Sequence, residues 1–247
     1  MLPEGQAAGS RMHVLDWLDG GTFIPRINDM LQPTELFVPQ SGKRMPRGWD
    51  NTDEARLGKE CGALIDNSLN ATLLNWWLVN VAGANVPNWD LACEALYHGN
   101  RPAIVLAEAK AYVREFTDGV RGNAAENPDN RTRIATAIDE ARVGLSRHDP
   151  GVKISSERWY QFANRVAFAW KLASHGIPTA LVYLGFLGDK QISTDPLGDH
   201  DHWRGTVLDN TREIFPASMW ERAIDINGTP LWFLIRSLPC IRQSPPK

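Results

Sequence analysis

The segment from Trp89 to Lys110 constrains the fold of this chain more than any other. Two runs of residues typical of strands, Trp89 to Leu96 and Ala103 to Lys110, flank the sequence Tyr-His-Gly-Asn-Arg-Pro, which is rich in turn-forming residues. This pattern predicts a β-hairpin. The second run begins Ala-Ile-Val-Leu-Ala and is apolar on both faces, which is typical of a central strand. The chain therefore needs further elements on both sides of the sheet.

The remaining pattern supplies such elements and predicts an α/β fold. Apolar residues at helical spacing predict helices over 53–66 and 132–145, and Ser155 or Ser156 is suited to cap a helix that runs to about His175 and stops at Gly176. Thr179 to Leu187 and Leu231 to Ile235 are predicted strands, the latter after an Asn-Gly turn. The run 73–81 fits either a helix or a strand.

The chain divides by composition into three parts. Residues 1–52 are rich in Gly, Pro and polar residues and predict an irregular N-terminal arm around the core. Residues 53–240 carry the predicted α/β domain, and residues 241–247 form a short tail. The length of 247 residues is sufficient for one large domain with a substantial core.

Charge, cysteine content and hydropathy exclude several classes of protein. A net charge of −3 excludes a globally basic protein that coats nucleic acid, so any such contact must be local. The three cysteines have no CxxC spacing, which argues against a disulfide framework or a zinc knuckle. No segment reaches the roughly 20 apolar residues of a membrane span, and the first residues do not resemble a targeting signal. We therefore expect a cytoplasmic protein without membrane contact.

The predicted hairpin brings two acidic residues together. A turn centred on Gly99 places Asp90 opposite Glu108, and opposed Cβ atoms in such a pair are roughly 4.5–5.5 Å apart. Lys110 lies two residues after Glu108 and so shares its face of the strand. One face of the sheet is therefore expected to present Asp90, Glu108 and Lys110 together.

Burying two acids and a lysine on an apolar strand is costly unless the group has a partner. A hard cation such as Mg²⁺ or Mn²⁺ is one suitable partner, because oxygen ligands hold it while the lysine orients a water molecule or offsets phosphate charge. This arrangement predicts phosphodiester hydrolysis. The alternative is a structural ion pair at the end of a strand.

Asp90, the sequence Glu108-Ala109-Lys110 and their hairpin resemble the signature of the PD-(D/E)XK nuclease superfamily. The resemblance implies a restriction-endonuclease-like mixed sheet flanked by helices in the order αβββαβ, with 53–66 as the first helix and 73–81 as the candidate for the unassigned strand. It also implies that the Ala109 carbonyl joins Asp90 and Glu108 in holding the metal. The chain departs from the family pattern because Asn88 and Trp89 separate Pro87 from Asp90.

The same resemblance implies two further site residues. Glu60, on the predicted first helix, would point at the metal; the alternative is an exposed residue beside Lys59. Gln161 resembles a glutamine that contacts the site in several branches of the superfamily. Arg158 and Arg165 share its helical face, which would meet phosphates or solvent, whereas Trp159, Phe162, Val166, Trp170 and Ala173 form the expected buried stripe.

These observations predict a Mg²⁺-dependent nuclease that acts on DNA or RNA, with a homodimer as a possible assembly. A non-catalytic binding or assembly subunit with the same fold is the alternative, favoured by the acidic net charge. The run Asp199-His200-Asp201-His202 offers ligands for a transition metal, but turn formation after Gly198 is the favoured explanation, because alternate residues on a loop rarely converge without further ligands.

Overall fold

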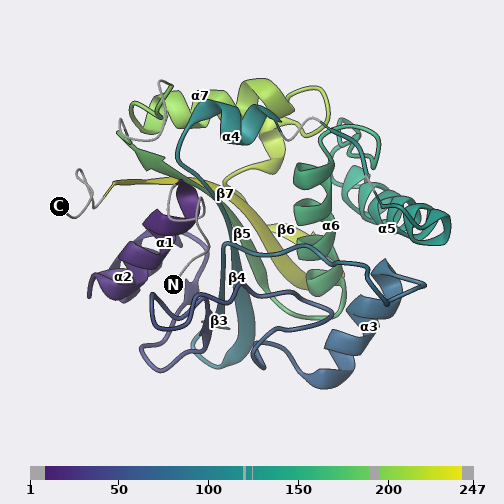
Figure 1. Cartoon of the computed structure of the whole chain (residues 1–247), viewed down its shortest axis with the longest axis horizontal. Helices are drawn as coiled ribbons and strands as arrows, with labels where there is room; N and C mark the ends of the chain where they lie inside the picture. The colour runs from purple at the N-terminus through teal and green to yellow at the C-terminus, as the bar shows by residue number, and fades with distance from the viewer. Residues whose placement is uncertain (1–8, 119–120, 124, 190–194, 241–247) are drawn as a thin grey trace.

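The computed structural model describes residues 9–118, 121–123, 125–189 and 195–240. Its elements, shown in Figure 1, are α1 (Ser10–Asp19), α2 (Phe23–Met30), β1 (Leu36–Phe37), β2 (Arg44–Met45), α3 (Asn67–Trp77), β3 (Leu91–Tyr97), β4 (Arg101–Lys110), α4 (Val113–Thr117), α5 (Pro128–Ser146), α6 (Tyr160–Ser174), β5 (Thr179–Leu187), α7 (His200–Thr211), the 3₁₀ helix η2 (Ala217–Met219), β6 (Ile224–Ile226) and β7 (Thr229–Pro239).

The strands of the described chain form one mixed, curled sheet flanked by helices (Figure 1). Its order is β1-β3-β4-β5-β7-β6, and β2 also pairs with β3. Strands β3 and β4 are antiparallel, whereas β4, β5 and β7 run parallel to one another. The parallel pairs require crossover connections, and α6 supplies the last part of the one between β4 and β5. The sheet therefore combines a hairpin with a parallel centre.

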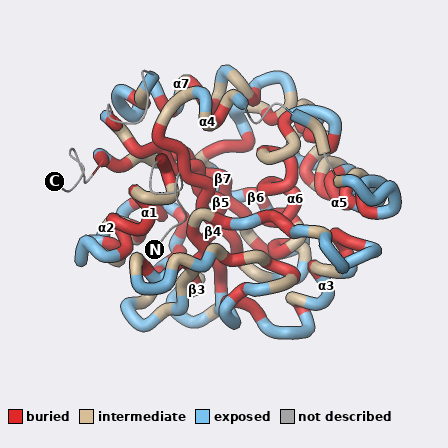
Figure 2. The backbone as a smooth tube through the Cα atoms, in the orientation of Figure 1, coloured by how far each residue is buried: buried red, intermediate tan, exposed pale blue. Residues whose placement is uncertain are grey.

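The alternation of side chains along β4 divides the core into two layers. Ile104 and Leu106 pack in one cluster with the apolar residues of α3, α5 and α6. Val105 and Ala107 point to the opposite face and pack with those of α1 and α2. Both faces are therefore covered, and the central strands are buried along their length (Figure 2). A polar side chain on β4 must find its partners inside the protein.

Most predicted elements of the central part are confirmed. The hairpin has the expected register, in which Leu91 pairs with Ala107 and Tyr97 with Arg101. Helices α5 and α6 and strands β5 and β7 occupy the predicted segments, and Asn227-Gly228 forms the turn between β6 and β7 with both residues at positive φ. The α/β fold class is correct.

The expectations for the first third of the chain are largely wrong. The arm is not irregular, because residues 9–52 contain α1 and α2, and β1 and β2 pair with β3 in the main sheet. Its first eight residues and the tail 241–247 lie outside the described residues. The predicted helix over 53–66 is a series of turns and extended segments. Two glycines interrupt it, Gly58 at φ +98° and Gly62 at φ +57°.

Two smaller expectations also need correction. Residues 73–81 do not form the missing strand, because α3 extends through Trp77. Neither Ser155 nor Ser156 caps α6, which begins after Trp159 in a left-handed conformation at φ +54°. Among the described residues, no helix has the length and apolar character needed to cross a bilayer.

Candidate functional site

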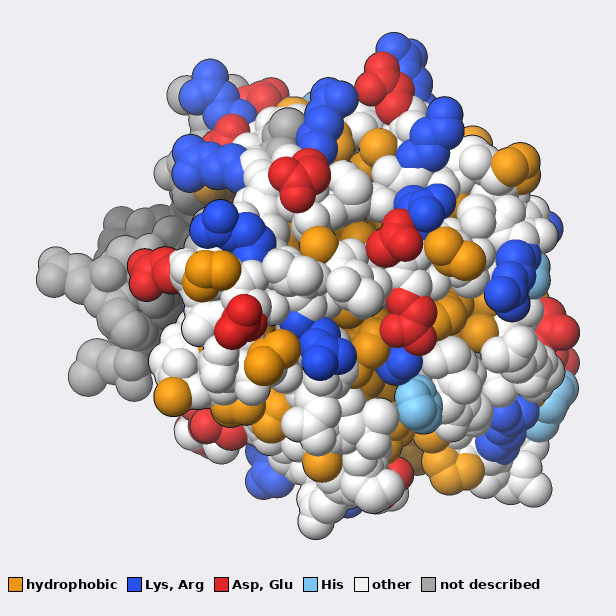
Figure 3. Space-filling model, turned by 90° about the vertical axis from the view of Figure 1, so that its right-hand side faces the viewer, with side chains coloured by type: hydrophobic (Ala, Val, Ile, Leu, Met, Phe, Trp, Pro, Cys, Tyr) orange, Lys and Arg blue, Asp and Glu red, His pale blue; other side chains and the backbone are white. Residues whose placement is uncertain are grey.

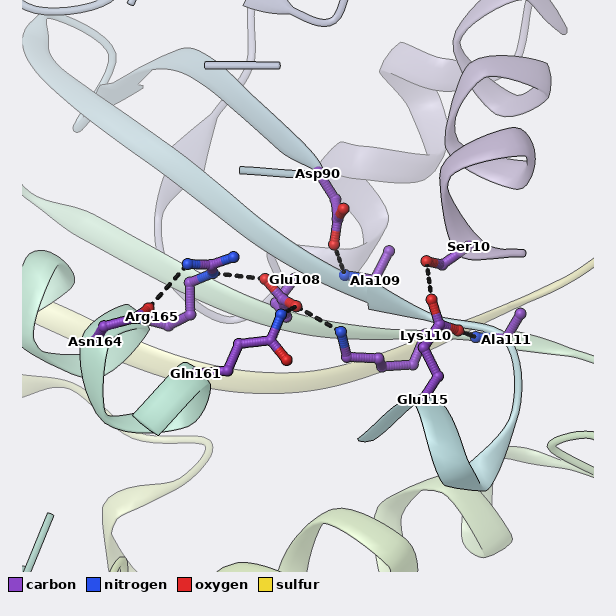
Figure 4. A network of polar contacts seen from close by, with 10 residues as sticks. All are labelled: Ser10, Asp90, Glu108, Ala109, Lys110, Ala111, Glu115, Gln161, Asn164 and Arg165. Carbon is purple, nitrogen blue, oxygen red and sulfur yellow. Dashed lines mark hydrogen bonds and ion pairs between the residues drawn. The ribbon is translucent and has the colours of Figure 1, made fainter. Parts of the chain in front are cut away.

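The open end of the β3–β4 hairpin brings Asp90 to strand β4. Asp90 immediately precedes β3, and its Oδ2 accepts a hydrogen bond of 2.7 Å from the backbone N–H of Ala109 (Figure 4). The Asp90 carboxylate therefore pairs with a backbone N–H of β4 just beyond the last residue pair of the hairpin. Asp90 keeps partial solvent exposure. Its place beside Glu108 follows from the hairpin register.

Glu108 is the centre of the polar cluster and is only 1% exposed. Lys110 Nζ lies 2.5 Å from its Oε1, and Arg165 Nε lies 2.5 Å from its Oε2. Gln161 Nε2 donates a further hydrogen bond of 2.7 Å to Oε1. Both carboxylate oxygens of Glu108 therefore have partners within the protein (Figure 4).

Helix α6 delivers two of these partners because Gln161 and Arg165 are one turn apart on it. The Arg165 guanidinium also lies over the indole of Trp89, with its Cζ 4.9 Å from the ring centroid. A cation over an indole face is favourable, and burial strengthens the attraction. Arg165 is therefore fixed from two sides, by a carboxylate on β4 and an aromatic ring before β3.

Burial and charge shift the pKa values of this cluster in opposite directions. Although Asp90 keeps some exposure, burial of its carboxyl group and the nearby charge of Glu108 raise its pKa to about 8. Burial alone would raise the pKa of Glu108, but the positive charges of Arg165 and Lys110 outweigh it and lower the pKa. Burial acts to lower the pKa of Lys110, yet Glu108 and Asp90 raise it. These shifts favour the ionised form of Glu108 and the protonated form of Asp90.

A small cavity adjoins the cluster. It has a volume of about 10 Å³ and is lined by Glu108, Lys110, Phe116, Trp159, Gln161, Phe162 and Tyr183. This space suffices for about one water molecule. A phosphodiester would have to displace the surrounding side chains to reach Glu108.

The structure thus brings together five of the predicted residues, Asp90, Glu108, Ala109, Lys110 and Gln161, and Ala109 contacts Asp90 through its backbone N–H. It does not bring Glu60 to them: this residue lies outside any helix, its side chain is 70% exposed, and its carboxylate pairs with Arg56. Arg158 is also separate, because it precedes α6, is exposed and pairs with Glu213 at 3.4 Å.

The Asp199 to His202 run forms the start of α7. Asp199 is the N-cap residue, and its Oδ1 accepts a hydrogen bond of 2.8 Å from the His202 N–H. His200 Nδ1 instead lies 3.0 Å from Ser237 Oγ. The imidazoles have separate partners, so helix capping accounts for the run and the metal interpretation is not supported.

Two contributors were missed or misjudged from the sequence. Arg165 is a buried ion-pair partner, not a surface residue, and the signal was a charge one turn after Gln161 within an apolar helix. Glu115 lies at the edge of the cluster, and its Oε2 accepts a hydrogen bond of 2.7 Å from the Ala111 N–H. The charge of Glu115 helps to raise the pKa of Lys110. No local sequence pattern connects Glu115 to the hairpin.

Comparison with known proteins gives no relative for this chain. No family model, no curated protein and no solved structure matches it. The chemistry of the cluster must therefore be argued from its own geometry.

Proposed function

We propose that this chain is a metal-dependent nuclease that hydrolyses phosphodiester bonds in nucleic acid, with DNA as the first expected substrate and RNA as the second. The observation that carries the proposal is the convergence of Lys110 and Gln161 on Glu108, with Asp90 next to them. These four side chains come from the open end of the hairpin and from the later helix α6. Their resemblance to the PD-(D/E)XK signature supports the same assignment.

The oxygen donors of the cluster fit a hard divalent cation. Asp90 and Glu108 would hold Mg²⁺ or Mn²⁺ with the Ala109 carbonyl, and a bound cation would supply Lewis-acid activation of a phosphate. Burial and the charge of Glu108 raise the pKa of Asp90 to about 8, and a bound cation would favour its ionised form. Cation binding requires Glu108 to exchange one of its present partners and Asp90 to release its proton.

The chain's own residues would then position the reactants. Lys110, freed from Glu108, is close enough to that carboxylate to hold a water molecule beside it and to offset the charge of a phosphate. Gln161 would keep the Glu108 side chain in place through its hydrogen bond. Glu60 has no part in this arrangement, because its exposed carboxylate pairs with Arg56.

A non-catalytic binding or assembly subunit is the second candidate, and two specific observations favour it. Glu108 is already neutralised by two cationic side chains, Lys110 and Arg165, and the adjoining cavity holds only about 10 Å³. In addition, Lys and Arg side chains alternate with Asp and Glu on the face shown in Figure 3, so that face has no uniform positive patch for a polynucleotide.

Calorimetry and a cleavage assay separate the two candidates. The nuclease predicts binding of Mg²⁺ or Mn²⁺ to the purified protein, and metal-dependent cleavage of single- or double-stranded DNA or of RNA. Lys110→Met and Gln161→Ala should lower cleavage at least about 100-fold, the usual size of a lost proton-transfer or positioning group. Asp139→Asn, an exposed acid paired with Arg142 on α5, is the matched control and should cleave as the parent does.

The outcomes are decisive in both directions. Absence of cation binding and of cleavage would reject the nuclease and support the non-catalytic subunit. Cleavage that is unchanged in folded Lys110→Met and Gln161→Ala proteins would place the activity elsewhere and also reject this site. Circular dichroism of each variant establishes that the protein compared is folded.

A further inference from the structure

A second group of metal-binding side chains lies on the other side of the sheet, under α1. His13 is on α1, Asp189 follows β5 and Cys240 directly follows β7. His13 Nε2 lies 2.7 Å from Asp189 Oδ2 and 3.4 Å from Cys240 Sγ. One ligand atom from each residue falls within 4.8 Å of the other two. Residues separated by up to 227 positions thus meet at one point.

The fold fixes this meeting point. Strands β5 and β7 are parallel neighbours, and Leu187 pairs with Pro239 at their carboxyl ends. The residues that follow the two strands therefore leave the sheet side by side. The N–H of Cys240 donates a hydrogen bond of 3.0 Å to the carbonyl of Leu187, and this bond holds the cysteine beside β5. Helix α1 packs across these strand ends, and the ring of His13 lies 5.2 Å from that of Phe186.

All three side chains are buried, with residue exposures of 1% for His13, 5% for Asp189 and 8% for Cys240. Buried polar groups need partners, and buried charges need them most. His13 and Asp189 partner each other at 2.7 Å, and the thiol of Cys240 completes a buried set of three side chains of types that bind metals.

Protons satisfy this cluster only in part. An Nδ1–H on His13 is buried without a hydrogen-bond partner among the described residues, both in an imidazolium and in an imidazole that binds a metal through Nε2, so this atom does not separate the two cases. The neutral tautomer protonated at Nδ1 would instead turn the Nε2 lone pair toward the Asp189 carboxylate. The tautomer protonated at Nε2 satisfies Asp189 but gives the nearby thiol no acceptor on the ring.

Imidazole nitrogen, carboxylate oxygen and thiolate sulfur are each ligand types that zinc takes in proteins. Tetrahedral Zn²⁺ with its usual bond lengths separates such ligand atoms by roughly 3.3–3.7 Å. The distance of 3.4 Å between His13 Nε2 and Cys240 Sγ already meets this spacing. The distance from His13 Nε2 to Asp189 Oδ2 must increase by well under one bond length.

We propose that His13, Asp189 and Cys240 bind Zn²⁺, with water in the remaining position, and that the metal fastens α1 to the ends of β5 and β7. On binding, Cys240 forms the metal–sulfur bond and its thiol proton passes to solvent. Metal uptake by this site therefore releases one proton.

Cobalt is the probe for this site, because Co²⁺ takes zinc positions and gives a thiolate charge-transfer band in the near ultraviolet. We expect reduced, metal-stripped parent protein to bind one equivalent of Co²⁺ with this band, and Zn²⁺ to abolish the band. The unfolding temperature should rise with the concentration of added Zn²⁺. A cation held by Asp90 and Glu108 would give no such band, since that cluster contains no sulfur.

Matched variants locate the sulfur ligand. Cys240→Ala should lose the band, whereas Cys61→Ala should keep it, because Cys61 is a comparably buried free cysteine elsewhere in the core. Asp189→Asn preserves the side-chain shape, should fold as the parent does, and should bind Co²⁺ at least about 10-fold more weakly. A parent without the band, or a band of equal strength in folded Cys240→Ala, would overturn the proposal.

Discussion

Arg165 on α6 and Glu108 on β4, 57 positions apart in the chain, form a buried ion pair with 2.5 Å between Nε and Oε2. The pair joins the helix to the centre of the sheet, and Trp89 covers the guanidinium. Because Lys110 adds a second positive charge to the same carboxylate, Glu108 contacts two cations directly. The stability of the site therefore depends on Glu108 more than on either cation.

This imbalance predicts unequal effects of two isosteric substitutions. Glu108→Gln leaves Lys110 and Arg165 buried without their anion and should destabilise the protein by about 3 kcal/mol, even if Asp90 releases its proton in response. Lys110→Met leaves the Arg165–Glu108 pair intact and should change the stability by no more than about 1 kcal/mol. Urea unfolding near neutral pH measures both. Equal losses in the two variants would contradict this account of the charges.

Asp90→Asn should stabilise the protein increasingly as the pH rises. The pKa of Asp90 is about 8 in the folded protein, above the ordinary value of 3.8, so folding favours its protonated form. That contribution is complete below about pH 4 and is lost as the pH rises to about 8. Asparagine cannot ionise and still accepts from the Ala109 N–H.

Denaturant unfolding at about pH 5 and about pH 9 tests whether the stabilisation by Asp90→Asn grows with pH. The free energy of unfolding of Asp90→Asn should exceed that of the parent by about 1–3 kcal/mol at about pH 9 and by much less at about pH 5, after discounting for the partial exposure of Asp90. Asp139→Asn on α5 is the exposed control and should show no such trend. A variant that loses stability relative to the parent as the pH rises would exclude a raised pKa. Saturating Mg²⁺ should narrow the difference if the parent binds it.

The pairing of Asp90 with Glu108 was predictable because it depends on local rules. The short turn around Gly99 fixes the register, and the register fixes which residues face each other. Gln161 needed the family resemblance as well, since α6 and the hairpin are far apart in sequence. The final partner, Arg165, follows from packing, because a charge one turn after Gln161 in an apolar helix is compatible with burial and with exposure alike.

The wrong predictions for the first third of the chain also have a physical cause. Apolar residues in 53–66 recur at helical spacing and do reach the core, but Gly58 and Gly62 adopt positive φ and direct the chain through turns. Helix α1 was overlooked although Val14, Trp17 and Leu18 follow helical spacing. Its polar residues His13 and Asp16 are buried as well, so the contrast between its faces is weak.

Helix capping predicts the behaviour of the Asp199 to His202 run. Asp199→Ala removes the acceptor for the His202 N–H and should cost about 1 kcal/mol of stability. Asp201→Ala, in the first turn of the same helix, removes only a favourable charge near the helix N-terminus and should cost about 0.3 kcal/mol. Thermal unfolding compares the two. If His200→Ala and His202→Ala changed the bound metal content, capping would not be a sufficient explanation of the run.

A pair of glycine substitutions tests how α7 is held above the site. A Cβ on Gly185 of β5 would lie 2.7 Å from Cγ of Trp203, whose ring is fully buried and donates from Nε1 to the Tyr183 carbonyl at 3.2 Å. Tyr183 lines the cavity beside Glu108. Trp203 also packs against Phe116, with 5.6 Å between ring centroids, so it has little freedom to retreat. Gly185→Ala should therefore destabilise the protein by about 1–3 kcal/mol.

Gly205 on α7 is the matched control for that clash. A Cβ there meets nothing within 4 Å, and alanine favours a helix over glycine, so Gly205→Ala should stabilise the protein by about 0.5–1 kcal/mol. Both changes add one methyl group and remove the same backbone freedom from the unfolded chain, but only the methyl group at Gly185 meets Trp203. Thermal and urea unfolding should give opposite signs for the two variants. Stabilisation by Gly185→Ala would show that Trp203 does not pack on β5.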